Sequence, residues 1–142
     1  MDKTATELRL ECMALDLQYP EYFLAIEDQE LSRIWNGVGA ESWPVFMREF
    51  ITWIYRHFET SALIHDVRFD YSDGTILGCK LANQEMFDNL HLTLSLLYPW
   101  HKPWLLPFRA WAHFKICCAE QALTSVAGYE AYYQAFVAKS KR

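Results

Sequence analysis

The chain has 142 residues, of which 52% are hydrophobic and 16% aromatic, and its formal net charge is −5 at pH 7. A chain of this length fits one domain with one core, so we expect residues 1–142 to form a single domain. Because Lys and Arg cluster only in the last few residues, the acidic balance argues against a nucleic-acid partner that is bound by phosphate neutralisation.

The four cysteines show no Cys-x-x-Cys spacing, which argues against a structural zinc site or a disulfide framework. We expect free, mostly buried thiols, as in a reducing compartment such as the cytoplasm. The first residues lack the basic segment and apolar run of a signal peptide, and no stretch approaches the roughly 20 apolar residues of a membrane span.

Residues 1–34 are expected to form N-terminal helices. Thr4 and Glu7 make a capping box, and Leu8, Cys12 and Leu15 recur at helical spacing toward Gln18. Pro20 then closes this helix. Two short helices are expected over 20–27 and 28–35, where Asn36-Gly37 follows as a stop signal.

Residues 35–98 are expected to carry the polar motifs. A helix is predicted over 42–58, a second over 62–71, and a third over 80–97, with at most a short strand or hairpin near 75–79. On the third helix, Asn83 begins a stripe of apolar residues that continues through Phe87, Leu90, Leu94 and Leu97. Because a buried amide needs partners, we expect Asn83 to be hydrogen-bonded where this helix packs.

Residues 99–142 are expected to hold an aromatic loop and the C-terminal helices. Prolines 99, 103 and 107 exclude a continuous helix there, and Trp100, Trp104 and Leu105 give the loop a large apolar surface. This loop either packs over the core or docks on a lipid interface or a protein partner. Helices are predicted from Pro107 and over 129–138, separated at Gly128, which completes an all-α fold of about six helices.

The segment Trp35–Ala40 and the dipeptide His65-Asp66 are the candidates for chemistry. Gly37 and Gly39 allow several backbone carbonyls to turn toward one point, where Asp66 could add the carboxylate that a hard cation such as Ca²⁺ prefers. The alternatives are a helix cap without a ligand, a satisfied His-Asp pair and an Asn83 that only bridges two core helices. A metal phosphohydrolase of the His-Asp type would need His57 and His91 as further ligands, and it leaves the glycines unexplained.

These motifs, in this order, resemble those of the phospholipase A2 superfamily, in its cysteine-poor parvoviral or phage type. Trp35-Asn36-Gly37-Val38-Gly39-Ala40 resembles the calcium loop, and His65-Asp66 resembles the catalytic pair. The segment Ala82–Phe87 is similar to the helix that supplies the residue orienting the histidine. The resemblance implies a phospholipase A2-like core and a calcium-dependent lipid esterase, encoded by a phage or prophage or delivered by a virion.

The resemblance also implies roles for individual residues. Ca²⁺ would be held by the carbonyls of Trp35, Gly37 and Gly39 with the Asp66 carboxylate, and the Gly37 N–H would stabilise the oxyanion. His65 would be the general base and Asn83 its orienting partner. Asn83 stands where the family has Asp, and Phe69 where it usually has Tyr. These two departures favour the alternative function, a non-catalytic binding or structural protein that retains the scaffold.

Overall fold

The computed structural model describes residues 3–35 and 58–141, and every regular element in these ranges is a helix. The predicted all-α fold is thereby confirmed, whereas the helix expected over 42–58 lies outside the described residues. The α-helices are α1 (Ala5–Ala14), α2 (Asp28–Ile34), α4 (Glu59–Asp70), α5 (Ile76–Leu97), α6 (Leu106–Leu123) and α7 (Val126–Ser140). Two short 3-10 helices, η1 (Glu21–Ala25) and η2 (Pro103–Leu105), complete the set.

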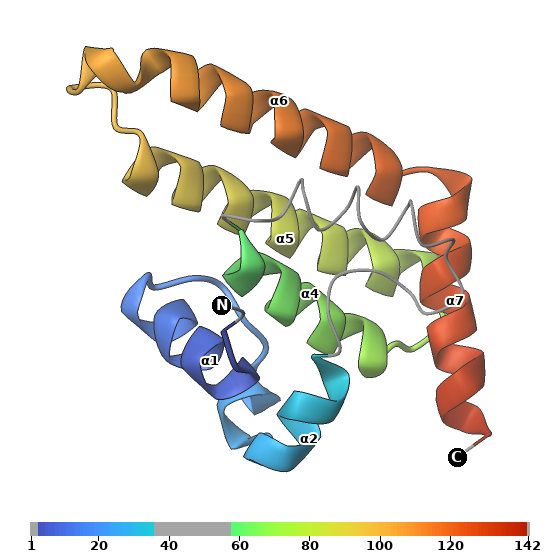
Figure 1. The fold of residues 1–142 in the computed structure, drawn as a ribbon. Coiled ribbons are helices and arrows are strands. Elements are labelled where there is room, and N and C mark those ends of the chain that lie inside the picture. Colours follow the sequence, from blue (N-terminus) through green and yellow to red (C-terminus); the bar gives the residue numbers. More distant parts are fainter. Residues whose placement is uncertain (1–2, 36–57, 142) are drawn as a thin grey trace.

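The helix α4 lies at the centre of the arrangement (Figure 1). The helices α1 and α2 contact one side of it, and α5 packs antiparallel against another side. The helices α5 and α6 form a long antiparallel hairpin, and α7 crosses its far end to contact α4 as well. A residue on α4 can therefore meet partners from four other helices.

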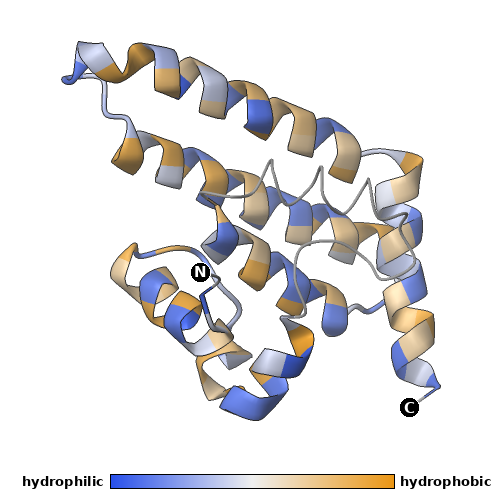
Figure 2. Cartoon of the chain, in the orientation of Figure 1, coloured by the Kyte–Doolittle hydropathy of each residue, from blue (hydrophilic) through white to orange (hydrophobic). Residues whose placement is uncertain are grey.

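Two main hydrophobic clusters explain why α4 is central. One cluster joins α1 and α2 to α4 through residues that include Leu8, Leu31 and Leu63. The other joins α4 to α5 and α6 through residues that include Ala62 and Leu90. Hydrophobic residues recur along all the helices (Figure 2), yet no helix in the described ranges is both long and apolar enough to cross a bilayer.

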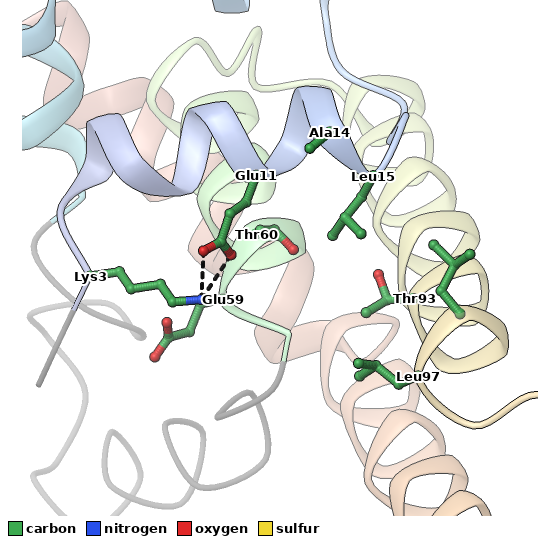
Figure 3. A pocket seen from close by; sticks show the side chains of 9 residues that line it. Lys3, Glu11, Ala14, Leu15, Glu59, Thr60, Thr93 and Leu97 are labelled. Carbon is green, nitrogen blue, oxygen red and sulfur yellow. Dashed lines mark hydrogen bonds and ion pairs between the residues drawn. The ribbon is translucent and has the colours of Figure 1, made fainter.

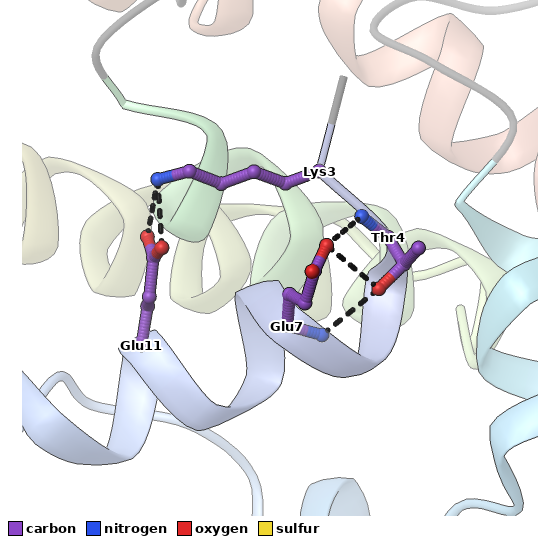
Figure 4. Close-up of polar contacts among 4 residues, drawn as sticks. All are labelled: Lys3, Thr4, Glu7 and Glu11. Atoms are coloured by element: carbon purple, nitrogen blue, oxygen red, sulfur yellow. Dashed lines mark hydrogen bonds and ion pairs between the residues drawn. The ribbon is translucent and has the colours of Figure 1, made fainter. Parts of the chain in front are cut away.

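The helix α1 begins as its capping box predicts. The Thr4 hydroxyl accepts a hydrogen bond from the Glu7 N–H at 3.2 Å, and the Glu7 carboxylate accepts one from the Thr4 N–H at 2.8 Å (Figure 4). The helix ends at Ala14, four residues before the expected Gln18, because Asp16 adopts a left-handed conformation with φ of 53°. The expected short helix over 20–27 is the 3-10 helix η1.

The strand or hairpin considered near residues 75–79 is absent, and α5 begins at Ile76, not Lys80. Thr75 is the N-cap, because its hydroxyl accepts a hydrogen bond from the Gly78 N–H at 2.9 Å. Asp73 holds Thr75 in turn, with Oδ1 accepting from the Thr75 N–H at 2.9 Å. The threonine and glycine that suggested an extended segment are thus a helix cap and its first turn. The preceding helix α4 starts at Glu59, earlier than the expected Ala62.

Gly128 does not separate two helices as predicted but lies in the first turn of α7, which Ser125 caps. A Cβ at Gly128 would lie 2.3 Å from the Leu123 carbonyl oxygen at the end of α6. Only glycine allows the two helices to meet at so close a corner. This corner brings the Leu123 carbonyl toward α5, where it becomes part of the candidate site.

Candidate functional site

His65 and Asn83 meet between the antiparallel helices α4 and α5. The His65 Nε2 lies 3.1 Å from the Asn83 Oδ1, and both side chains are buried. The sequence predicts this contact, since an amide at the head of an apolar stripe needs a polar partner. The contact is confirmed, while the catalytic roles of the two residues stay predictions.

The Leu123 carbonyl fixes which way the Asn83 amide points. The Asn83 Nδ2 donates a hydrogen bond to the Leu123 oxygen at 3.0 Å, and a carbonyl can only accept. The Asn83 Oδ1 therefore faces the imidazole, and it can only accept as well. It follows that the His65 Nε2 carries the proton and that the Nδ1 lone pair is free of any hydrogen bond to a described residue.

Burial lowers the pKa of His65 from 6.5 to about 4, and the hydrogen bond that His65 donates to Asn83 only partly opposes this shift. The imidazole is therefore neutral at pH 7, as a general base must be before it takes a proton. Asn83 has no charge with which to stabilise the imidazolium that proton transfer would create. The geometry thus suits a base, but the electrostatics make it a weak one.

The aromatic surroundings hold the His65 ring in place. The Phe69 ring lies 4.3 Å from the imidazole, centroid to centroid, and the Tyr132 ring meets Phe69 edge-on at 5.1 Å. The Tyr132 hydroxyl donates to Asp73, not toward His65. Tyr71, which could have supplied the phenol missing at Phe69, packs on Tyr22 instead.

Asp66 is half-buried, and no described residue makes a hydrogen bond or ion pair with its carboxyl. Desolvation raises its pKa well above the usual value. A bound cation would offset this cost, so the side chain fits the carboxylate role in a Ca²⁺ site. Trp35 packs against the cluster that contains Ala62, one helical turn before Asp66. Gly37 and Gly39 lie outside the described residues, as does the rest of the predicted calcium loop.

A pocket of about 460 Å³ opens beside Asn83, between the start of α5 and the α6–α7 corner. Its walls are largely apolar, and Ile76, Phe87 and Val126 contribute to them. His65 does not line this pocket. The site can therefore offer an apolar chain a place next to Asn83 and its Leu123 partner, which both line the pocket.

A second pocket of about 470 Å³ lies where α1 meets the start of α4 and the end of α5 (Figure 3). Its polar end holds Lys3, Glu11 and Glu59, and its opposite side holds Leu15, Thr93 and Leu97. The Lys3 ammonium is paired with Glu11 at 2.7 Å, which also raises the pKa of Lys3. None of the described residues that line this pocket is a histidine or cysteine, and Lys3 is already paired with Glu11.

The aromatic loop does not pack over the core. The side chains of Trp100 and Trp104 are 71% and 67% exposed, and Leu105 is half-buried. Arg109 lies over the Trp100 ring at 4.2 Å. Trp100 and Trp104 therefore do not pack over the core, and docking of the loop on a lipid interface or a protein partner stays a prediction.

Among the further histidines, His91 contacts Glu120 at 2.8 Å between α5 and α6, and His57 lies outside the described residues. No three His, Cys, Asp or Glu side chains of the described ranges gather to hold a metal ion. All four cysteines are free thiols, two of them buried and Cys117 exposed.

Comparison with family models, curated proteins and solved structures found no match. The site must therefore be interpreted from its own geometry. The role of Leu123 could not be predicted from the sequence, because this residue contributes a backbone carbonyl and its side-chain type gives no signal.

Proposed function

We propose that this chain is a calcium-dependent, phospholipase A2-like lipid esterase in which His65 is the general base. The observation that supports this best is the tautomer of His65: Asn83 accepts from Nε2, and no described residue makes a hydrogen bond with Nδ1, which can therefore take a proton from water. The lone Asp66 carboxyl on the next residue adds the group that a Ca²⁺ site would need.

In this proposal each residue has a separate role in proton transfer, ring orientation or cation binding. His65 takes the proton of the attacking water at Nδ1, while Asn83 holds the ring by accepting from Nε2. Asp66 and the Trp35 carbonyl would hold Ca²⁺ together with Gly37 and Gly39, and the ion would supply electrostatic stabilisation of the developing oxyanion. The apolar pocket beside Asn83 would accommodate an acyl chain.

The buried, weakly basic imidazole limits the rate of this reaction. With a pKa of about 4, His65 gains a proton at an energetic cost that an amide partner cannot repay. The same observation favours the second candidate function, a binding or structural protein that keeps the scaffold without turnover. The two candidates differ in whether replacing Asn83 by Asp produces activity.

The test is fatty-acid release from phospholipid mixed micelles with Ca²⁺ or with a chelator. We expect slow, calcium-dependent release by the wild type, a loss of about 100-fold or more in His65→Ala, and a rise of about tenfold in Asn83→Asp, because a carboxylate raises the histidine pKa. Gln121→Ala, an exposed amide on α6 that does not line the pocket beside Asn83, is the control and should be unchanged.

Asn83→Asp places a carboxylate oxygen opposite the Leu123 carbonyl, so this variant should be less stable and is assayed well below its melting temperature. Absence of calcium-dependent hydrolysis in both the wild type and the folded Asn83→Asp variant would exclude the esterase and leave the scaffold function.

A further inference from the structure

Residues 89–119 contain no acidic side chain, although the whole chain has 18. The segment holds Lys102, Arg109, the buried Lys115 and three of the five histidines. It forms the later part of α5, the connecting loop and most of α6 (Figure 1). In a chain that is acidic overall, this part of the hairpin therefore carries no acidic side chain of its own, and Asp88 and Glu120 border it.

The same end exposes large aromatic side chains. Besides Trp100 and Trp104, Phe108 is 59% exposed, and His101 and Lys102 between the tryptophans are exposed as well. Exposed Trp next to Lys suits a boundary that is apolar on one side and wet on the other. We call residues 98–109 the hairpin tip.

A pocket of about 490 Å³ lies between α5 and α6 directly behind the hairpin tip. Its polar lining is Ser95, His91, Arg109 and His113, and Trp100 and Leu106 form part of its apolar wall. The His91 and His113 rings lie 6.1 Å apart, centroid to centroid. The Arg109 guanidinium, the His113 imidazole and the Ser95 hydroxyl are hydrogen-bond donors for an anion with several oxygens, such as a phosphate, whereas the His91 Nε2 is engaged by Glu120.

Arg109 keeps donors available in this pocket. It donates from one terminal nitrogen to the Tyr98 carbonyl at 2.6 Å, and no carboxylate of the described residues pairs with it. Glu120 borders this lining, and its carboxylate lies 2.8 Å from the His91 Nε2. The guanidinium is thus positioned by the loop and the Trp100 face without being neutralised.

We propose that the hairpin tip docks on the surface of an anionic lipid bilayer, with Trp100, Trp104 and Phe108 entering the interface and the α5–α6 pocket receiving the phosphate of a lipid headgroup. The lack of acidic residues over 89–119 supplies the charge complementarity with such a surface. Aromatic side chains flanked by cations are the composition that interfacial segments share.

This docking does not depend on ester hydrolysis. Tyr98 follows Asn83 by 15 positions, which corresponds to about 22 Å along α5. The imidazole site therefore lies well away from the docked end, and a His65→Ala variant should bind vesicles as the wild type does. Failure of hydrolysis and failure of docking are distinguishable for this reason.

The experiment is co-sedimentation of the full chain with vesicles of phosphatidylcholine alone or with about a third of phosphatidylglycerol. We expect at least tenfold tighter binding to the anionic vesicles at low salt, weakened by high salt. Trp100→Ser together with Trp104→Ser should reduce this binding at least tenfold, and Lys102→Gln about fivefold. Leu77→Ser, an equally exposed apolar position at the other end of α5, should bind as the wild type does.

The pocket is tested with Arg109→Lys and with soluble competitors. Arg109→Lys keeps the charge but loses the fork of donors, so we expect about fivefold weaker binding to anionic vesicles with an unchanged melting temperature. Glycerol 3-phosphate at millimolar concentration should compete with the vesicles for the pocket. Inorganic phosphate should compete less well, and equal competition by the two would mean that the pocket binds free phosphate and not a headgroup. Equal binding to both vesicle types, or no effect of the two tryptophan substitutions, overturns the proposal. If the wild type sedimented without vesicles and the tryptophan substitutions abolished this, the proposal would also be overturned. The hairpin tip would then bind a second copy of the protein.

Discussion

The side-chain amide of Asn89 makes both hydrogen bonds that the backbone of Gln18 offers. The Asn89 Oδ1 accepts from the Gln18 N–H at 2.8 Å, and the Asn89 Nδ2 donates to the Gln18 carbonyl at 2.7 Å. Asn89 is completely buried on α5, so this pair attaches the segment after α1 to the centre of the fold. Like the bond from Asn83 to the Leu123 carbonyl, it joins a side chain to a distant backbone, here 71 positions away.

Asn89→Ala should lower the free energy of unfolding by about 2 to 3 kcal/mol, because it leaves two backbone groups without partners and a small cavity. Asn89→Asp keeps the acceptor and loses the donor, so its cost should also be substantial. Urea denaturation measures both values, with Gln84→Ala as the exposed control on the same helix. A cost below about 0.5 kcal/mol for Asn89→Ala would contradict this role.

Gly78→Ala should destabilise the protein although alanine normally favours a helix over glycine by about 1 kcal/mol. A Cβ at Gly78 would lie 2.3 Å from the Asp73 Oδ1 and 2.5 Å from the Tyr132 hydroxyl. We expect a loss of about 1 to 3 kcal/mol by denaturation. In a Tyr132→Phe background the same substitution should cost less, and a double-mutant cycle gives the coupling. Stabilisation by Gly78→Ala would show that this contact is not close.

The stability of the fold should depend on pH through His65. Because its pKa in the folded state, about 4, lies below the ordinary 6.5, the unfolded chain binds this proton first as the pH falls. The contribution of the neutral imidazole is complete above about pH 6.5, and up to about 3 kcal/mol of it is lost between pH 6.5 and 4.

Asp66 acts in the opposite direction, because a raised pKa means that acidification relieves the cost of its buried charge. The measurement is therefore the difference in unfolding free energy between wild type and His65→Gln at each pH, in which the Asp66 contribution cancels. This difference should shrink as the pH falls from 6.5 to 4, and a constant difference would mean that His65 titrates normally.

Calcium should stabilise the wild type through Asp66. At a concentration 100 times the dissociation constant, a ligand that binds only the folded state adds about 2.7 kcal/mol to the free energy of unfolding. Asp66→Asn should abolish this gain and, without Ca²⁺, should itself be more stable than the wild type because it removes a partly buried charge without a described partner. Thermal melts with Ca²⁺, Mg²⁺ and a chelator provide the readout. If Ca²⁺ changed the melting temperatures of the wild type and Asp66→Asn equally, Asp66 would not be a ligand of the ion.

The helices that sequence patterns predicted best are those with strong periodicity and a cap. The Thr4 capping box and the apolar stripe of α5 correspond to observed elements, and the stripe also placed Asn83 correctly against His65. Where the prediction failed, a nonlocal contact decided. Gly78 lies in the first turn of α5, where Asp73 and the distant Tyr132 leave no room for a side chain. The sequence alone gives no sign that Tyr132 requires a glycine there.

The candidate site was predictable only in its side chains. His65, Asp66 and Asn83 could be selected by residue type and spacing, but the pKa of His65 depends on burial by helices distant in sequence. The buried Asn89 escaped prediction because it does not stand on the apolar stripe that drew attention to Asn83. The exposure of Trp100 and Trp104 likewise follows from the direction of the hairpin and not from composition.

The Leu123 carbonyl belongs to the last residue of α6, at the opposite end of this helix from the hairpin tip. This helix has 18 residues and is about 27 Å long, with the hairpin tip at its start and Leu123 at its end. The bond from Asn83 to the Leu123 carbonyl orients the amide toward His65, and the amide decides which imidazole nitrogen holds the proton. A main-chain carbonyl at one end of α6 thus sets the tautomer of the histidine, while the other end of the same helix begins at the hairpin tip.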